Sequence, residues 1–485
     1  VDGTYFTIDG RKSFWIGAQA FVARQTAYTS ASALRLYRDF KSMREAGMRI
    51  SRNFFGWNPG DVSDSDERER VLRLMDACVL LSQKFGIVNY FNAVCGNEIP
   101  RTLDGISAEA RDVEMFARRY RNVPGFLMDV RNEPRLACAK RPTGQEAMSD
   151  HSLADAFSAW SRAVADAAAR GRPGIGVATG WSQGWGWASA YKDPPTAVLP
   201  FSFTDCHYYG ENSSHLAEIK KIDQRILGRP AVMGECGVAF NPERIQYSDS
   251  FATEEEAARR YRCQAVQTFG SGYAFMCNYG WTDHIEGNLT FAFRHWDGNP
   301  REVLKVYSKL AKAFSSFEVG ESRPEVALVL SDARFVRGGL NRVLNVYRRA
   351  VDALSWWGVN YSVIPKCAKT RIPDDVRLVL DTAQLAAAGL EGACDEDLKI
   401  DPRAYVGDML AKAGVVVSRQ AGDADALGVF RVPMKGGGEA WAFWNPNRQA
   451  PVSVERGGRR LVIGPDRAGL IRLSADGSLI GMEEL

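Results

Sequence analysis

The 485-residue sequence has few of the features that mark metal, redox or membrane proteins. It contains only five histidines, with no HExxH motif and no paired spacing, and its nine cysteines include no CxxC pair. A zinc site, a thioredoxin-type redox site and a catalytic metal are therefore not expected. Because no run of 18 apolar residues occurs, a membrane-spanning helix is not expected either.

The charge balance argues against a further class of function. Net charge is only +3, so the basic surface typical of nucleic-acid binding is not expected. The hydrophobic content of 45% and the charged content of 25% are ordinary for a globular protein, and the length allows two or three domains. The cysteines are scattered, and several lie in apolar runs, as Cys206, Cys236 and Cys277 do. This pattern predicts buried free thiols and favours a cytoplasmic or periplasmic location.

Strand-like apolar runs alternate with amphipathic helical stripes over the first 320 residues. The stripe formed by Val71, Leu74, Met75 and Cys78 is typical of the helical segments. The strand-like runs lie at 14–17, 48–55, 87–91, 125–131, 174–179, 201–206, 230–233 and 273–277. These alternations predict a (β/α)8 TIM barrel in which the fifth helix is truncated. A doubly wound sheet is the alternative, but it gives no reason for acidic residues at the ends of strands four and seven.

The pattern changes twice after the barrel. Strands at 326–330, 361–364 and 376–380, with a helix at 344–354, predict a small open α/β (Rossmann-like) domain. It carries no GxGxxG motif, so a nucleotide is not expected there. Short alternating strands at 440–444, 452–454, 461–463 and 470–473 then predict a small β-sandwich. The predicted domains are 1–320, 321–424 and 425–485.

Two acidic motifs end apolar runs about a hundred residues apart. Asn132-Glu133-Pro134 follows the fourth predicted strand, and Gly234-Glu235-Cys236-Gly237 follows the seventh. Barrel enzymes carry their chemistry at the C-terminal ends of the strands, so both carboxylates are expected at one mouth of the barrel. Enzymes that hydrolyse glycosidic bonds use a pair of carboxyl groups of this kind, one protonated and one ionised.

These motifs resemble those of the large clan of (β/α)8 retaining glycoside hydrolases that includes the family 5 β-glycanases and the family 42 β-galactosidases. The resemblance covers the first 320 residues and implies that Glu133 is the acid/base and Glu235 the nucleophile. Further matches are Arg52 five residues after a glycine, His207-Tyr208-Tyr209 as His-x-Tyr on strand six, and Trp281 after strand eight. The chain departs from many family 5 members at 92–96, where Asn-Ala-Val-Cys-Gly lacks a histidine.

The resemblance assigns a role to each matched residue. Arg52 and Tyr209 are expected to donate hydrogen bonds that keep the nucleophile ionised. Asn132 is expected to bind the sugar hydroxyl next to the reacting carbon, and His207 to orient the surroundings of the acid. Trp281 is expected to form the floor under the reacting sugar. A structural ion pair for Arg52 and core packing for Trp281 are the alternatives.

The segment after the fifth strand carries two competing interpretations. Trp181, followed by Trp185 and Trp187, is expected either to line further sugar subsites or to belong to a hydrophobic lid. Residues 180–184 also read G-x-S-x-G, the nucleophile elbow of α/β-hydrolases, which would make Ser182 an esterase nucleophile. The Trp-Gly-Trp that follows is a poor helix start, and no HGGG-type segment is present. A catalytically inactive carbohydrate-binding barrel is a third alternative, against which the two glutamates argue.

The accessory domains resemble those of family 42 enzymes and of some exo-acting β-mannosidases, in which the middle domain helps to build a trimer. The resemblance therefore implies a retaining, exo-acting β-glycosidase that needs no cofactor and no metal. A β-mannosidase is the first choice, and a β-galactosidase or an endo-β-glucanase is the alternative. The expected partners are an oligosaccharide or glycoside substrate and, in a homotrimer, further copies of the chain; nucleic acid and membrane are not expected.

Overall fold

The structure is a computed structural model that describes most of the chain. The described residues are 5–20, 30–53, 64–94, 98–100, 102–136, 151–181, 200–209, 229–240, 250–251, 253–283, 291–295, 297–330, 340–365, 372–390, 398–417, 428–456 and 459–485. Among the helices in these ranges, none combines the length and the apolarity that crossing a bilayer requires.

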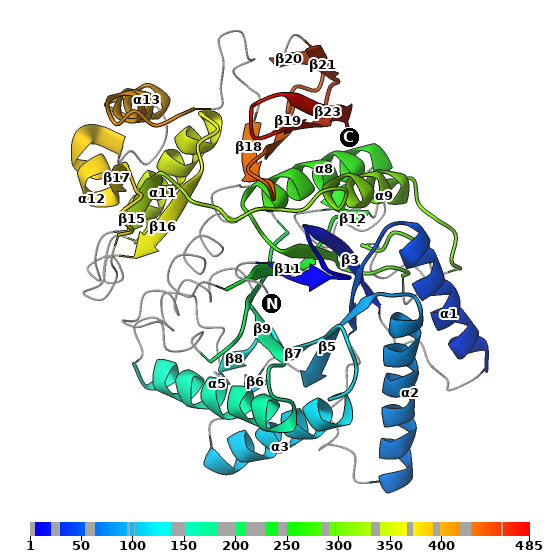
Figure 1. Ribbon diagram of the computed structural model, residues 1–485. Helices are drawn as coiled ribbons and strands as arrows, with labels where there is room; N and C mark the ends of the chain where they lie inside the picture. The colour runs from blue at the N-terminus through cyan, green and yellow to red at the C-terminus, as the bar shows by residue number, and fades with distance from the viewer. Residues whose placement is uncertain are drawn as a thin grey trace.

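Eight parallel strands close into a barrel in the N-terminal part of the chain (Figure 1). They follow one another around the barrel in chain order: β3 (Trp15–Ala20), β4 (Ile50–Asn53), β5 (Val88–Val94), β7 (Phe126–Asn132), β9 (Gly176–Trp181), β10 (Thr204–His207), β11 (Ala231–Cys236) and β14 (Phe275–Asn278). The barrel closes where β14 pairs with β3, with Phe275 opposite Trp15. The predicted TIM barrel is confirmed, and each predicted strand overlaps one of these.

Helices cover the outside of the barrel where the apolar stripes predict them. They are α1 (Ser30–Glu45), α2 (Ser65–Lys84), α3 (Leu103–Arg119), α5 (His151–Gly171), α8 (Glu254–Gly270) and α9 (Val303–Phe314). Helix α2 begins at Asp64, whose carboxylate accepts hydrogen bonds from the amides of Asp66 and Glu67. The predicted helix at 216–226 and the truncated fifth crossover lie outside the described residues.

Six short strands form small pairs beside the barrel. They are β1 (Thr7–Ile8) with β2 (Arg11–Lys12), β6 (Glu98–Ile99) with β8 (Arg135–Leu136), and β12 (Ala239–Phe240) with β13 (Ser250–Phe251). The pair β6–β8 directly follows the ends of two barrel strands, β5 and β7. It thereby ties together the segments that leave the barrel next to Glu133.

Aromatic side chains fill the interior of the barrel toward the N-terminal ends of its strands. The ring of Tyr90 lies 5.7 Å from those of Phe203 and Phe275, and Phe6 packs 5.3 Å from Phe203. All four side chains are buried. This apolar layer supports a polar layer above it, toward the C-terminal ends, where the candidate site lies.

The second body of secondary structure is a parallel three-stranded sheet with helices. Its strand order is β16 (Tyr361–Pro365), β15 (Val326–Leu330) and β17 (Leu378–Asp381). The helices are α11 (Leu340–Trp356), α12 (Thr382–Leu385) and α13 (Pro402–Lys412), with a short π-helical turn η2 (Ala386–Leu390). The open α/β fold is as predicted, but α13 was not foreseen, because Val406 and Leu410 are the residues it buries and they make too short a stripe.

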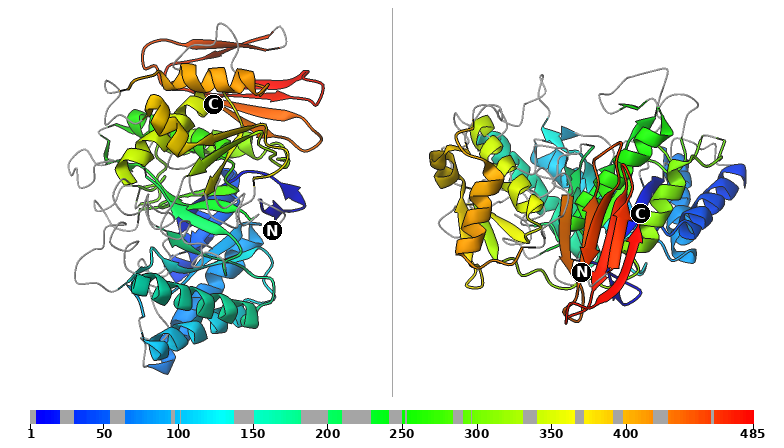
Figure 2. Two further views of the ribbon diagram at one scale, coloured as in Figure 1. Left: turned by 90° about the vertical axis from the view of Figure 1, so that its left-hand side faces the viewer. Right: turned by 90° about the horizontal axis from the view of Figure 1, so that it is seen from above.

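The C-terminal strands form two packed layers. An antiparallel sheet contains β18 (Gly428–Pro433), β19 (Glu439–Trp444), β22 (Ala468–Leu473) and β23 (Leu479–Glu484), and a hairpin contains β20 (Val452–Arg456) and β21 (Arg459–Ile463). Alternate residues of β19 face opposite ways, so Trp441 and Phe443 pack on the hairpin while Ala440 and Ala442 pack on the barrel. Figures 1 and 2 show the sheet beside α8, which β18, β19 and β22 contact. The predicted small β-sandwich is therefore present and docked.

Candidate active site

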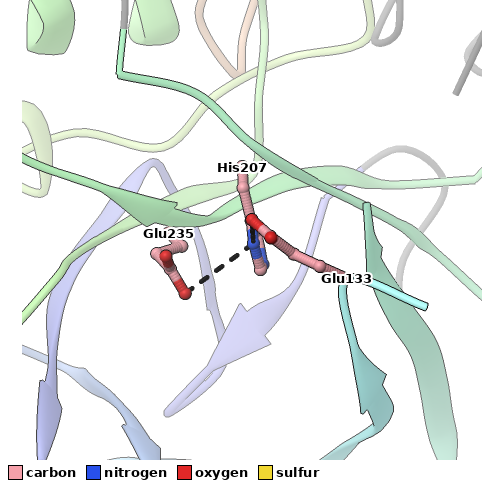
Figure 3. A group of neighbouring side chains, drawn as sticks. All are labelled: Glu133, His207 and Glu235. Carbon is pink, nitrogen blue, oxygen red and sulfur yellow. Dashed lines mark hydrogen bonds and ion pairs between the residues drawn. The ribbon is translucent and has the colours of Figure 1, made fainter. Parts of the chain in front are cut away.

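The two candidate catalytic glutamates lie at the same mouth of the barrel. Glu133 directly follows β7, and Glu235 is the penultimate residue of β11. His207 ends β10, the strand beside β11, and Figure 3 shows its ring next to both glutamates. One carboxylate oxygen of each glutamate and one ring nitrogen of His207 lie within 4.8 Å of one another. Barrel closure thus brings together side chains that are about a hundred positions apart in the sequence.

Each carboxylate oxygen of Glu235 accepts a hydrogen bond. Arg52 donates from Nη1 to Oε2 at 2.9 Å, and the hydroxyl of Tyr209 donates to Oε1 at 2.5 Å. Arg52 is fully buried and also donates from Nη2 to Asp129 and to Asn132, each at 2.6 Å. The side chain of Glu235 is only 9% exposed, so these partners replace most of the water around the carboxylate. The structure thus places the predicted residues Arg52 and Tyr209 on Glu235.

Glu133 has a different environment and a strained backbone. Its φ of 43° lies in the left-handed region, where a residue other than glycine costs about 1–3 kcal/mol. The amide of Glu133 donates to the carbonyl of Gly180 at 2.7 Å, which holds this conformation. Its side chain is 21% exposed, more than that of Glu235, and its Oε1 lies 3.0 Å from Nδ1 of His207. Glu133 is therefore the more accessible of the two carboxyl groups.

His207 faces acidic groups on both edges of its ring. Its Nδ1 lies 3.0 Å from Oε1 of Glu133 and 3.7 Å from Oε2 of Glu235, and its Nε2 lies 3.8 Å from Oδ2 of Asp205. Burial opposes the charged ring, but Glu235, Asp205 and Glu133 outweigh this effect and raise the pKa of His207 to about 10. A metal ion here would have to displace the proton of the ring, and Arg52 already occupies Oε2 of Glu235. These contacts favour a hydrogen-bonded group of side chains over a metal site.

Two buried aspartates belong to the polar layer and were not predicted as site residues. Asp129 accepts hydrogen bonds from Arg52, from the side-chain amide of Asn92 at 3.0 Å and from the backbone of Gly180 at 3.0 Å. Asp205 accepts from the hydroxyl of Tyr90 and from the backbone of Gly234, both at 2.6 Å. One sequence signal could have identified both aspartates: each is an acidic residue inside a predicted apolar strand. A carboxylate is rarely buried unless it has partners, so such a residue is a candidate for a polar network.

Trp281 is too buried to form the floor under the reacting sugar, which would need an exposed ring face. Its side chain is 1% exposed, its indole N–H donates to Ser42 of α1 at 3.2 Å, and its ring packs against Phe293. This position favours the core-packing alternative. Two residues earlier, the half-buried Tyr279 lies 6.4 Å from Tyr209 and 5.5 Å from Phe291, ring centre to ring centre. These three rings form an aromatic wall beside Glu235.

The G-x-S-x-G segment is partly described. Trp181 ends β9, and its backbone is described but its side chain is not; Ser182, Trp185 and Trp187 lie outside the described residues. A Cβ atom at Gly180 would lie 2.5 Å from Nε2 of His207. The first glycine of the segment is therefore required by the close approach of His207, which is a packing reason unrelated to an esterase elbow.

Gly234 is required by the approach of Asp205 in the same way, and this predicts a stability effect. A Cβ atom at Gly234 would lie 2.1 Å from Oδ2 of Asp205. Gly234→Ala is expected to lower the free energy of unfolding by about 1–3 kcal/mol, as overpacking of a tight interior does. Urea denaturation measures this quantity. Gly464→Ala is the control, because the nearest atoms there, Oε1 of Glu484 at 3.0 Å and Cγ of Arg467 at 3.3 Å, belong to flexible side chains. Equal stability of the two variants would contradict the close packing.

Comparisons with known proteins place this geometry in a known fold. No family model and no curated protein matches the sequence. A β-galactosidase from Rahnella sp. R3 superimposes with a TM-score of 0.72 at 10% identity, over 99% of this chain and 100% of that chain. For a β-galactosidase from Halorubrum lacusprofundi the TM-score is 0.67 at 12% identity, over 94% and 98%.

A third similar structure comes from another family of barrels. It is a GH5_18 variant from Streptomyces cattleya in complex with Manb1-4GlcNAc, with a TM-score of 0.58 at 15% identity, over 77% of this chain and 100% of that chain. The β-galactosidases thus cover nearly the whole chain, whereas the GH5_18 structure covers about three quarters of it. This chain has the fold of the clan of (β/α)8 glycoside hydrolases that its motifs resemble.

Proposed function

We propose that this protein is a retaining β-glycosidase in which Glu235 is the nucleophile and Glu133 the acid/base. The observation that carries the proposal is the carboxylate separation of at most 4.8 Å between the facing oxygens. Retaining glycosidases hold their two carboxyl groups about 5–5.5 Å apart, whereas inverting enzymes leave about 6.5–9.5 Å for a water molecule. A covalent intermediate on Glu235 is the chemistry that fits this spacing.

The surrounding residues suit the two steps of this reaction. In the first step Glu235 attacks the anomeric carbon while Glu133 gives its proton to the departing glycosidic oxygen. Arg52 and Tyr209 hold the attacking carboxylate in place. In the second step Glu133 takes a proton from water, the water oxygen attacks the anomeric carbon, and the ester bond to Glu235 breaks. Asn132, oriented by Arg52, is the proposed donor to the neighbouring sugar hydroxyl.

For the substrate we propose a terminal β-linked hexose, cleaved from a chain end. A β-mannoside is the first choice, supported by the likeness to a GH5_18 chain solved with Manb1-4GlcNAc. A β-galactoside is the second, supported by the likeness to β-galactosidases over nearly the whole chain. Assembly into a homotrimer through residues 321–424 remains a prediction of the family resemblance, and sedimentation of the purified chain tests it.

A panel of 4-nitrophenyl β-glycosides tests the function and narrows the sugar. We expect wild-type protein to release nitrophenol from at least one β-hexoside, with the mannoside turned over faster than the galactoside and the glucoside. The α-anomers are the matched control and should not be cleaved, because the attacking carboxylate faces one side of the ring. Absence of turnover across the β-glycosides would count against the proposal, as would esterase activity that is lost on Ser182→Ala.

A further inference from the structure

Asp205 is a buried acid with no described lysine or arginine within ion-pair distance. It lies on β10, two residues before His207, so the two side chains share the interior face of the barrel. The side chain of Asp205 is fully buried, and its two hydrogen bonds come from neutral groups, the hydroxyl of Tyr90 and the amide of Gly234. Among the described lysines, arginines and histidines, His207 is the one within ion-pair distance. The charge of Asp205 therefore acts at shortest range on His207, and at longer range on Arg52.

When Glu133 is ionised, the neutral ring of His207 cannot donate a hydrogen bond to the carboxylates on both of its edges. Neutral imidazole has one N–H donor and one acceptor lone pair, and only imidazolium donates from both nitrogens. The Nδ1 edge faces Glu133 and Glu235, and the Nε2 edge faces Asp205. Once Glu133 has given its proton away, either neutral tautomer would therefore aim a lone pair at a carboxylate. Arg52 is the opposing cation from β4, but it is engaged by Asp129 and Glu235.

We propose that Asp205 is a positioning residue that keeps His207 as an imidazolium cation, and that this cation serves the acid/base Glu133 during the reaction. The first part concerns the charge state alone, and the second part rests on the proposed glycosidase function. The cation contacts Glu133 at 3.0 Å, so it stabilises the carboxylate that forms when Glu133 gives its proton away. In the second step the same cation holds that carboxylate where it takes the proton from water.

The raised pKa of His207 agrees with this role. It also predicts the direction in which the pKa should change when Asp205 is replaced. Removal of the Asp205 charge takes away one of the groups that raise the pKa, so His207 should lose its proton at lower pH. A single opposite charge at such a distance shifts a pKa by about 1–3 units. If the cation is needed, activity is present below the pKa of His207 and is lost as the pH rises through it. The alkaline limit of activity should therefore move to lower pH in Asp205→Asn.

The first experiment follows the His207 ring by NMR in protein labelled with 15N-histidine. His207→Gln assigns the signal among the five histidines. In wild type we expect both ring nitrogens to stay protonated to about pH 9, and in Asp205→Asn we expect titration about 1–3 units lower. Tyr90→Phe is the matched control, because it removes a hydrogen bond to the same carboxylate but keeps the charge. An unchanged titration in Asp205→Asn, or an equal shift in Tyr90→Phe, would overturn the proposal. Asp205→Ser, which also removes the charge, is the second variant if the asparagine protein does not fold.

The second experiment measures kcat/KM against pH with an aryl β-glycoside that the wild type cleaves. The alkaline limit should move to lower pH in Asp205→Asn by about the shift seen by NMR, and Asp205→Asn should change activity less than about twofold in the His207→Gln background. A shifted NMR titration with an unmoved pH profile would overturn the catalytic part of the proposal. If the wild type cleaves no glycoside, the proposed function fails, while the NMR titration still decides whether Asp205 controls His207.

Discussion

Glu235→Ala is expected to lower the rate of aryl β-glycoside hydrolysis by at least about 10⁴-fold, because the nucleophile and its covalent intermediate are lost. The fold should survive, since Arg52 keeps its partner Asp129 when the glutamate is removed. Initial rates of nitrophenol release measure the loss, and thermal unfolding checks the fold. Glu302→Ala is the control: this glutamate is exposed on the surface beside Lys305, and its loss should leave the rate unchanged.

Azide should restore turnover in Glu235→Ala. The space left by the carboxylate lies on the face of the sugar from which Glu235 attacks, so azide enters from that face. The expected product is a glycosyl azide of inverted anomeric configuration, which NMR of the product identifies. Wild-type-like activity without azide would remove Glu235 from its proposed role, and a rescued product of retained configuration would place the nucleophile elsewhere.

The second large effect is expected for Glu133→Gln and should depend on the leaving group. Glutamine keeps the shape of the side chain but cannot donate a proton to the departing oxygen. General acid catalysis contributes about 10²–10⁴-fold, so poor leaving groups such as sugars should lose about that factor. Dinitrophenyl glycosides need no protonation, so their first step should be nearly unaffected. Steady-state rates over a series of aryl leaving groups of different pKa measure this dependence.

The second step of the reaction gives an independent test of Glu133 in the same variant. Glu133 also acts as the base, so Glu133→Gln should release the sugar slowly and show a burst of dinitrophenol followed by slow turnover. Azide, which needs no base, should accelerate that turnover and give a product of retained configuration. A uniform loss for all leaving groups, with no burst, would indicate that Glu133 acts through structure and not through proton transfer.

The alternation of strands and helices was readable from the sequence because barrel strands are buried on both faces and barrel helices on one. Runs such as 125–131 are apolar apart from Asp129 and Arg131, and stripes such as that of α2 recur every three or four residues. Both signals are local, so they survive without knowledge of the fold. Helix α13 was missed because its local signal is weak. Its sequence has little apolar periodicity, and tertiary contacts and the cap at Asp401 stabilise it.

The candidate site was only partly readable. Glu133 and Glu235 stood out because each ends an apolar strand, and Arg52 and Tyr209 followed from their motifs. Asp205 did not stand out, because its importance comes from residues 29 and 115 positions away, Gly234 and Tyr90. Trp281 was expected at the sugar, yet it is buried and its indole N–H donates to Ser42 of α1, a neighbour 239 positions distant. No local pattern reports on which way such a side chain turns.

By itself the sequence determined the order of elements, the barrel and the strand ends that carry acidic residues, because these depend on short-range periodicity and on where apolar runs stop. Only the tertiary structure brought the acidic oxygens and the ring nitrogen within 4.8 Å of one another, and placed Asp205 on one edge of the His207 ring and the two glutamates on the other. The physical reason is closure of the barrel, because strands far apart in the chain hold their side chains at fixed distances only when the barrel is complete.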